Sequence, residues 1–206
     1  MWERSAVAAR SATGSSRRAA TRSGRLRPAE GAGAEPITTA EPSSADALYR
    51  LCRDIQQACL ERSLTLASAE SCTGGLVGHL LTEQPGSSGY YLGGLISYSN
   101  RLKEDELGVA RVTLEHHGAV SAQASVAMAE GARRRYGSDL AVAVTGIAGP
   151  DGGSPAKPVG LTYVAVADAT GHDVERHQWS GDRQANKLAS AGAALALLLK
   201  WLKDGP

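Results

Sequence analysis

Residues 66–75 constrain the fold of this chain more than any other stretch. They begin as a short apolar run, which is typical of a strand, and end in a polar, glycine-rich turn: Ser71, Cys72, Thr73, Gly74 and Gly75. Apolar pairs one helical turn apart follow at residues 76–77 and 80–81. The pattern predicts a strand, a tight turn and a helix. Such a turn leaves backbone N–H groups unpaired at the helix N-terminus, where an anion or a developing oxyanion can bind.

The turn also carries candidate nucleophiles. Ser71 has the strand–turn–helix placement that is associated with exposed nucleophiles. Ser71 and Thr73 fit a second interpretation equally well, because serine and threonine are preferred helix caps. Cys72 is a third candidate, but a cysteine nucleophile needs a stabilised thiolate, and neither histidine nor lysine is adjacent to it in the sequence.

The remaining apolar patterns alternate between helical and strand periods. A helix opening at Ser43, with Asp46 in its capping turn, precedes the first strand at residues 65–69. Further strands are predicted at residues 90–98, 139–144, 159–166 and 173–179. Helices are predicted after Gly74, at residues 100–107 and 120–136, and after Asp182. This alternation favours a three-layer αβα sandwich in a single α/β domain, and the two hairpin-like late strands favour a mixed, mostly parallel sheet.

Composition narrows the class of partner. The net charge of the 206-residue chain is +1, but residues 1–29 hold seven arginines and one acid, so they carry +6 and the remaining residues carry −5. A mildly acidic body argues against nucleic acid as the main partner. No apolar run approaches the ~18–20 residues that a membrane span needs. Cys52, Cys59 and Cys72 lack metal or disulfide spacing and favour a reducing compartment.

Residues 1–42 are rich in Ala, Arg, Ser, Gly and Pro and lack apolar periodicity. We interpret them as a disordered extension, because they cannot bury enough surface to offset the entropy of ordering. The same composition describes an organellar transit peptide. We favour a plain upstream extension and a cytoplasmic location, because no clear amphipathic helix is present, and we assign residues 43–206 to the folded domain.

Six motifs occur together in one order and cover roughly residues 45–203. They are Glu70-Ser71-Cys72-Thr73-Gly74-Gly75, Pro85-Gly86-Ser87-Ser88, Tyr98-Ser99-Asn100, His117-Gly118-Ala119-Val120-Ser121, Val144-Thr145-Gly146-Ile147-Ala148-Gly149-Pro150 and Lys157-Pro158-Val159-Gly160. In this combination the chain resembles the CinA C-terminal family, the nicotinamide-nucleotide amidases.

The resemblance implies a function. It implies hydrolysis of the carboxamide of nicotinamide mononucleotide to nicotinate mononucleotide and ammonia, in pyridine nucleotide salvage, by a homo-oligomer without a cofactor. Many members carry a larger N-terminal domain, which we expect this chain to lack. A catalytically silent nucleotide-binding or regulatory module is the alternative. A DNA-associated competence role, suggested only by the family's name, is the weakest reading.

The resemblance also implies a serine–lysine mechanism. Tyr98 and Lys103 match the family spacing, although Lys103 alone would pass for a solvated helix lysine. A lysine base must be neutral, which requires burial or nearby positive charge. We favour Ser88 as the nucleophile beside Lys103, and keep Ser71 at comparable weight.

The other candidate residues are assigned to substrate binding. Gly74 and Gly75 form a natural phosphate cradle, with Cys72 and Thr73 beside it. Thr145, next to Gly146, matches a family hydroxyl at the end of the third strand, and Arg183 matches a family arginine whose planar fork suits phosphate. No metal site is expected, because the histidines are isolated or adjacent and no HExxH pattern occurs.

Overall fold

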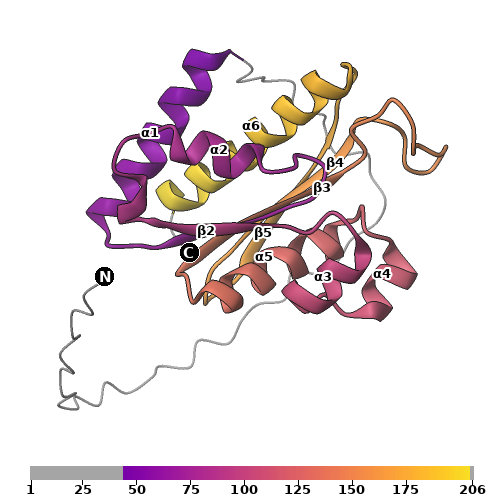
Figure 1. The fold of residues 1–206 in the computed structure, drawn as a ribbon, viewed down its shortest axis with the longest axis horizontal. Helices are drawn as coiled ribbons and strands as arrows, with labels where there is room; N and C mark the ends of the chain where they lie inside the picture. The colour runs from indigo at the N-terminus through magenta and orange to yellow at the C-terminus, as the bar shows by residue number, and fades with distance from the viewer. Residues whose placement is uncertain (1–43, 205–206) are drawn as a thin grey trace, which may run out of the picture. The chain divides into compact units, whose positions relative to one another are not determined.

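A five-stranded sheet forms the middle layer of the computed structural model, which describes residues 44–204 (Figure 1). The interpretations of residues 1–42 therefore lie outside the described residues. The strand order across the sheet is β2-β1-β3-β4-β5. The strands are β1 (Leu66–Glu70), β2 (Tyr91–Ile96), β3 (Leu140–Gly146), β4 (Leu161–Ala167) and β5 (His172–Gln178).

The sheet is mixed, as the sequence predicts. β1 pairs in parallel with both β2 and β3, whereas β4 is antiparallel to β3 and to β5. Four of these five strands therefore run in the same direction, and β4 runs against them. The carboxyl ends of β1, β2 and β3 meet at one edge of the sheet, which is the edge where open α/β sheets bind ligands.

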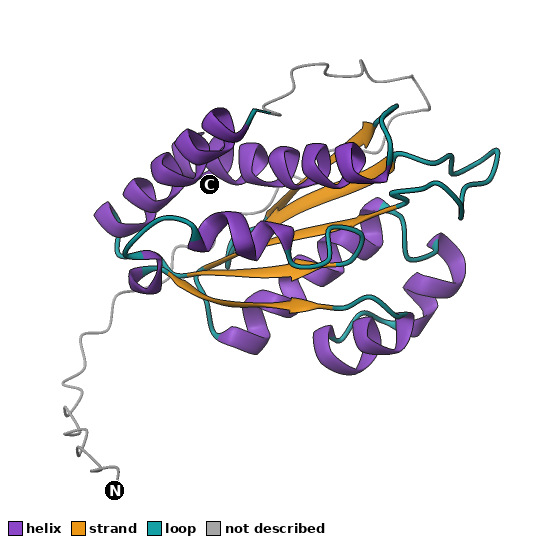
Figure 2. Cartoon of the chain, turned by 45° about the horizontal axis from the view of Figure 1, so that its top comes forward, coloured by secondary structure: helices purple, strands orange, loops and turns teal. Residues whose placement is uncertain are grey.

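Three helices cover one face of the sheet: α1 (Ala45–Glu61), α2 (Leu76–Thr82) and α6 (Arg183–Asp204) (Figures 1 and 2). Leu48, Cys52, Ile55 and Cys59 form the buried stripe of α1, at the spacing of an amphipathic helix. Its N-cap is Ser44, one residue after the predicted cap. The stripe packs against α6 and the sheet in one apolar core.

Three other helices cover the opposite face: α3 (Asn100–Leu107), α4 (Arg111–His117) and α5 (Ala122–Tyr136) (Figure 2). Small side chains let α5 lie close to the strands, with Ala124, Ala129 and Ala132 fully buried. Gly131 brings α3 equally close, since a Cβ at Gly131 would lie only 2.0 Å from the Leu107 carbonyl oxygen. The helix that carries Lys103 is thereby held against the core. The three-layer sandwich in a single domain is confirmed.

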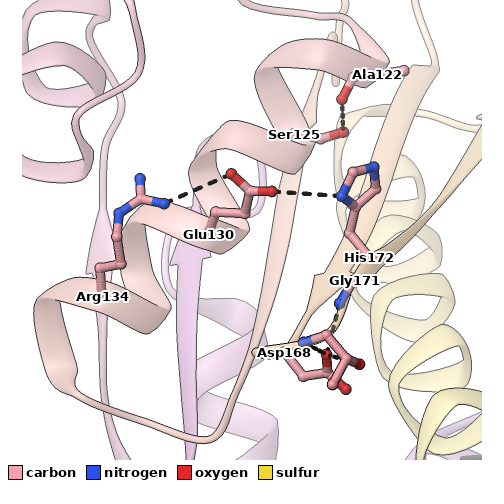
Figure 3. A network of polar contacts seen from close by, with 8 residues as sticks. Ala122, Ser125, Glu130, Arg134, Asp168, Gly171 and His172 are labelled. Atoms are coloured by element: carbon pink, nitrogen blue, oxygen red, sulfur yellow. Dashed lines mark hydrogen bonds and ion pairs between the residues drawn. The ribbon is translucent and has the colours of Figure 1, made fainter. Parts of the chain in front are cut away.

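β4 and β5 form the hairpin that the two late strands predict, with Thr170 and Gly171 in its turn. The carboxylate of Asp168 accepts hydrogen bonds from the backbone N–H groups of Thr170 and Gly171, at 2.6 and 2.9 Å. Figure 3 shows how the next residue, His172, meets Glu130 of α5, with 3.5 Å between His172 Nδ1 and Glu130 Oε1. The turn is thus tied to the helix below the sheet.

Two short elements were not predicted: α4 and a 3₁₀ helix, η1 (Ser87–Gly89). The N-cap of α4 is Ala110, which makes no side-chain cap bond, so the usual start signal is missing. In residues 44–204, no helix combines the length and the apolar character that a membrane crossing requires.

Candidate active site

The predicted site residues, except Ser88, converge at the carboxyl edge of the parallel strands. Ser71 follows β1, Tyr98 comes two residues after β2, and Thr145 lies near the end of β3. α6 starts at this edge after β5, which places Arg183 there. Residues that are up to 112 positions apart in the sequence are brought together because neighbouring strands share one direction.

At this edge the side chain of Lys103 is buried and contacts Ser71 and Ser97. Its side chain is only 1% exposed, although Arg101, Glu104 and Asp105 around it belong to a polar helix. The Lys103 ammonium donates to the Ser97 carbonyl oxygen at 2.6 Å and to Ser71 Oγ at 3.1 Å. The Lys103 ammonium and the Ser71 hydroxyl are therefore in direct contact in a buried position.

Burial changes the acidity of Lys103. It lowers the pKa of the ammonium to about 8, because the charged form loses its hydration. With a pKa of about 8, roughly a tenth of the Lys103 side chains are unprotonated at pH 7. A neutral amine that donates one N–H to the Ser97 carbonyl can accept a hydrogen bond from the Ser71 hydroxyl, as a general base does.

Glu70 occupies the turn that follows β1, in a way the sequence did not predict. Its carboxylate is 2% exposed. It accepts hydrogen bonds from the backbone N–H groups of Gly75, Val77 and Gly78, at 2.9, 3.1 and 2.9 Å. The Thr73 hydroxyl adds a fourth bond at 2.7 Å.

At the expected phosphate cradle, the Gly75 N–H is already bound to the Glu70 carboxylate and the Gly74 N–H to the Ser71 carbonyl oxygen. Neither Ser71 nor Thr73 caps α2, because Glu70 does so. The negative charge of Glu70 would also repel a phosphate placed on the helix N-terminus. Positively charged side chains at this edge are therefore better placed to bind an anion than the start of α2.

We expect Glu70→Ala to lower the free energy of unfolding by about 3–5 kcal/mol, because it leaves three backbone N–H groups without their acceptor. Urea denaturation measures this loss. Glu83→Ala is the control, since Glu83 is an exposed residue that lies 3.7 Å from His79 at the end of the same helix, and such pairs contribute little. Equal stability of the two variants would contradict the assigned role of Glu70.

Cys72 and Thr73 are enclosed rather than open to solvent. Burial raises the pKa of the Cys72 thiol to about 12, against the opposite influence of the backbone N–H groups of Cys72 and Thr73. Cys72 is thus a neutral thiol at physiological pH, which argues against it as the nucleophile. The Thr73 hydroxyl is bound to Glu70.

Thr145 and Gly146 line the same edge. The Thr145 hydroxyl is buried and donates to the Ala119 carbonyl oxygen at 2.7 Å, so it joins β3 to the segment that precedes α5. A Cβ at Gly146 would lie 2.7 Å from the Leu161 carbonyl oxygen and 3.1 Å from Cys72 Sγ. Glycine is required there for the close approach of β3, β4 and the turn.

Arg183 links the loop that follows β3 to the segment that follows β2. Its guanidinium donates to the Gly149 carbonyl oxygen at 2.6 Å and to the Tyr98 hydroxyl oxygen at 3.1 Å. Because Tyr98 accepts from Arg183, its own O–H remains available to another acceptor. A cavity of about 440 Å³ lies beside Arg183, lined by residues that include Gly149, Val159 and Asp182.

Ser88 lies at the other edge of the sheet. It is an exposed residue of η1, which precedes β2, and Tyr90 bonds the first residue of β1. The length of β1, roughly 13 Å at about 3.3 Å per residue, separates this edge from Ser71. Within one chain, Lys103 therefore contacts Ser71 and not the preferred Ser88.

No group of three or more His, Cys, Asp or Glu side chains with metal-binding geometry occurs within residues 44–204. A larger cavity, of about 700 Å³, lies at the edge opposite the carboxyl ends of the parallel strands. Its lining includes Arg62, Arg133, Asp139 and Trp201, and none of the predicted site residues.

The family model described as "CinA C-terminal domain" matches residues 48–202. The chain belongs to the CinA C-terminal domain family. The matched range contains every residue of the described edge, from Glu70 to Arg183.

Relatives of the CinA domain include a "CinA-like protein" of Geobacter sulfurreducens, 52% identical over 143 residues, which are 69% of this chain and 34% of the relative. A "Putative competence-damage inducible protein" of Desulforudis audaxviator is 49% identical over 143 residues, which are 69% and 35% of the two chains. The chain thus spans about a third of the length of these curated relatives.

Solved CinA structures share the fold. A competence/damage inducible protein of Agrobacterium tumefaciens has a TM-score of 0.71 and 42% identity, with 76% of this chain and 95% of that chain covered. A CinA superfamily protein of Klebsiella pneumoniae has a TM-score of 0.74 and 30% identity, with 77% and 99% covered. The α/β sandwich is therefore that of the CinA domain.

Proposed function

We propose that the chain is an amidohydrolase that converts nicotinamide mononucleotide to nicotinate mononucleotide and ammonia. One observation carries the proposal: the buried Lys103 amine lies 3.1 Å from Ser71 Oγ, with its other contact at the Ser97 carbonyl. The Ser71 hydroxyl beside this buried amine fits an activated nucleophile. The contact is not a structural ion pair, because no carboxylate within residues 44–204 forms a salt bridge with Lys103.

The mechanism follows from this contact. Ser71 Oγ attacks the carboxamide carbon while neutral Lys103 accepts the hydroxyl proton. The C–N bond then breaks, and Lys103 gives that proton to the leaving ammonia. Water attacks the resulting ester with Lys103 as the base, and the carboxylate product leaves as Ser71 regains its proton.

The substrate class comes from the family resemblance, and two features of the carboxyl edge of the sheet support it. The Tyr98 hydroxyl, held by Arg183, has an O–H free to donate to a bound carboxamide. The neighbouring cavity of about 440 Å³ lies within the range of ~300–1,000 Å³ that small-molecule sites occupy. Its arginine supplies positive charge for an anionic substrate.

A second arrangement keeps Ser88 as the nucleophile. Ser88 is exposed, so a second copy of the chain could bring its own Ser88 to Lys103 in the homo-oligomer that the resemblance implies. This arrangement requires both copies for each site. The arrangement within one chain does not, so the two differ in a measurable way.

The test of the function is an ammonia-release assay with nicotinamide mononucleotide, nicotinamide riboside and nicotinamide. We expect turnover to fall in that order, and to survive a chelator because the described mechanism uses no metal ion. If the mononucleotide binds without ammonia release, the protein is a silent nucleotide-binding module. Activity lost with the chelator and restored by zinc or manganese would contradict the serine–lysine mechanism.

A further inference from the structure

Lys187 lies at the carboxyl edge of the parallel strands, although no sequence pattern singled it out. It stands in the second turn of α6, and its side chain is half-buried. Its ammonium nitrogen lies 3.7 Å from the point that a Cβ would occupy on Gly74. The lysine therefore points at the turn between β1 and α2, next to Ser71.

The start of α6 is fixed, so this orientation is built into the fold. The buried Asn186 donates to the Ala148 carbonyl oxygen at 3.1 Å and accepts from the Gly181 N–H at 3.0 Å. One turn later, the hydroxyls of Ser190 and Thr162 are 2.9 Å apart. Lys187 projects from a segment that is held on two sides.

The Lys187 ammonium differs from those of Lys157 and Lys200 in having no hydrogen-bond acceptor beside it within the described part of the chain. Lys157 is held by the carbonyls of His117 and Val120, and Lys200 lies within 4 Å of Asp173 and Glu175. Across residues 44–204, no hydrogen-bond acceptor or carboxylate is in contact with Lys187 Nζ. A half-buried positive charge that faces the site without an acceptor is poised to bind an anion.

The turn between β1 and α2 offers few free hydrogen-bond donors, so anion binding there depends more on Lys187. Glu70 binds the backbone N–H groups of Gly75, Val77 and Gly78, so the turn itself has few donors left for a phosphate. Arg183, four residues before Lys187 on the same face of α6, already bonds Gly149 and Tyr98. The remaining unbound positive charge on this face of the helix is Lys187.

We propose that Lys187, together with the remaining N–H groups of Arg183, binds the phosphate monoester of the nucleotide substrate. The inference rests on the proposed function and names the group that selects the mononucleotide over the riboside. It also explains how this edge can accept a phosphate while Glu70 fills the turn.

The test compares Lys187→Met, Lys187→Arg and the control Lys203→Met, which removes an exposed lysine near the end of the same helix. The readout is the ratio of kcat/KM for the mononucleotide to kcat/KM for the riboside. We expect this ratio to fall about 10- to 100-fold in Lys187→Met, the value of a charged hydrogen bond, and to be partly retained in Lys187→Arg. The ratio of Lys203→Met should equal that of the parent protein.

A purely structural role would lower the melting temperature and leave this ratio unchanged, and that result would overturn the inference. A second measurement does not depend on turnover. Inorganic phosphate, compared with chloride at equal ionic strength, should raise the melting temperature of the parent protein and of Lys203→Met more than that of Lys187→Met. Equal shifts in all three proteins would overturn the inference, whereas parent protein that binds phosphate but releases no ammonia would overturn only the proposed function.

Discussion

Lys103→Met is expected to lower kcat/KM for nicotinamide mononucleotide by about 10²–10⁴-fold, because it removes the proposed general base and keeps an apolar stem in the buried site. In the parent protein, kcat/KM should rise with pH through one ionisation with a midpoint near the pKa of about 8. The sign follows from the mechanism, since only the neutral amine accepts a proton. Below the midpoint the rate should fall about tenfold per pH unit.

Two controls separate base catalysis from folding. Lys103→Arg keeps the charge but cannot lose its proton, so it should be as inactive as Lys103→Met. Arg101→Ala removes an exposed cation from the same helix, where it bonds Asp105 at 3.1 Å, and should keep a near-normal rate. A pH profile that is flat between pH 6 and about 9 would contradict the role of Lys103 as the base.

Ser71→Ala is expected to lower kcat by about 10,000-fold or more, since it removes the proposed nucleophile, which Lys103 contacts. Ser88→Ala should cost less than about tenfold if catalysis occurs within one chain, because Ser88 lies at the opposite edge of the sheet. The double variant Ser71→Ala with Lys103→Met should be no slower than the slower of the two single variants, since residues that act as a unit fail together. Steady-state ammonia release measures all four proteins.

Mixing variants decides between the two arrangements. Subunits with Ser88→Ala and subunits with Lys103→Met, assembled together, should stay inactive at the Lys103-deficient sites and show no gain over the sum of the separate variants. If Ser88 instead acts on Lys103 of a second copy, Ser88→Ala alone would be inactive. The mixture would then regain activity at sites that combine an intact Ser88 with an intact Lys103.

Local patterns were sufficient for most of the fold. The 3.6-residue stripe of Leu48, Cys52, Ile55 and Cys59 predicted α1, and the apolar run near residues 139–144 predicted the central strand β3. These elements follow from side-chain periodicity, which depends on neighbours in the sequence. The helix α4 was missed because Ala110 gives no side-chain cap, so its start carries no local signal.

The turn of residues 70–75 shows where local reasoning ends. The pattern of residues 66–81 predicted the strand, the turn and the helix correctly. From it we also expected free N–H groups at the helix start. The carboxylate of Glu70 folds back onto Gly75, Val77 and Gly78 and fills that position. An acidic residue five to eight positions before these donors is a usable signal, because helix N-termini favour negative charge.

Motifs and periodicity were enough to predict the αβα class, the family resemblance and the group of candidate site residues. Which of these residues meet depends on the tertiary fold, because pairing of β1 with β2 and β3 places their carboxyl ends together and leaves Ser88 at the far edge. It also decided that Lys103 is buried against Ser71, and that Lys187 faces the same turn from α6. Burial and contact between distant segments set the pKa of Lys103 and the charge of the site, and neither can be read from the polar helix in which Lys103 stands.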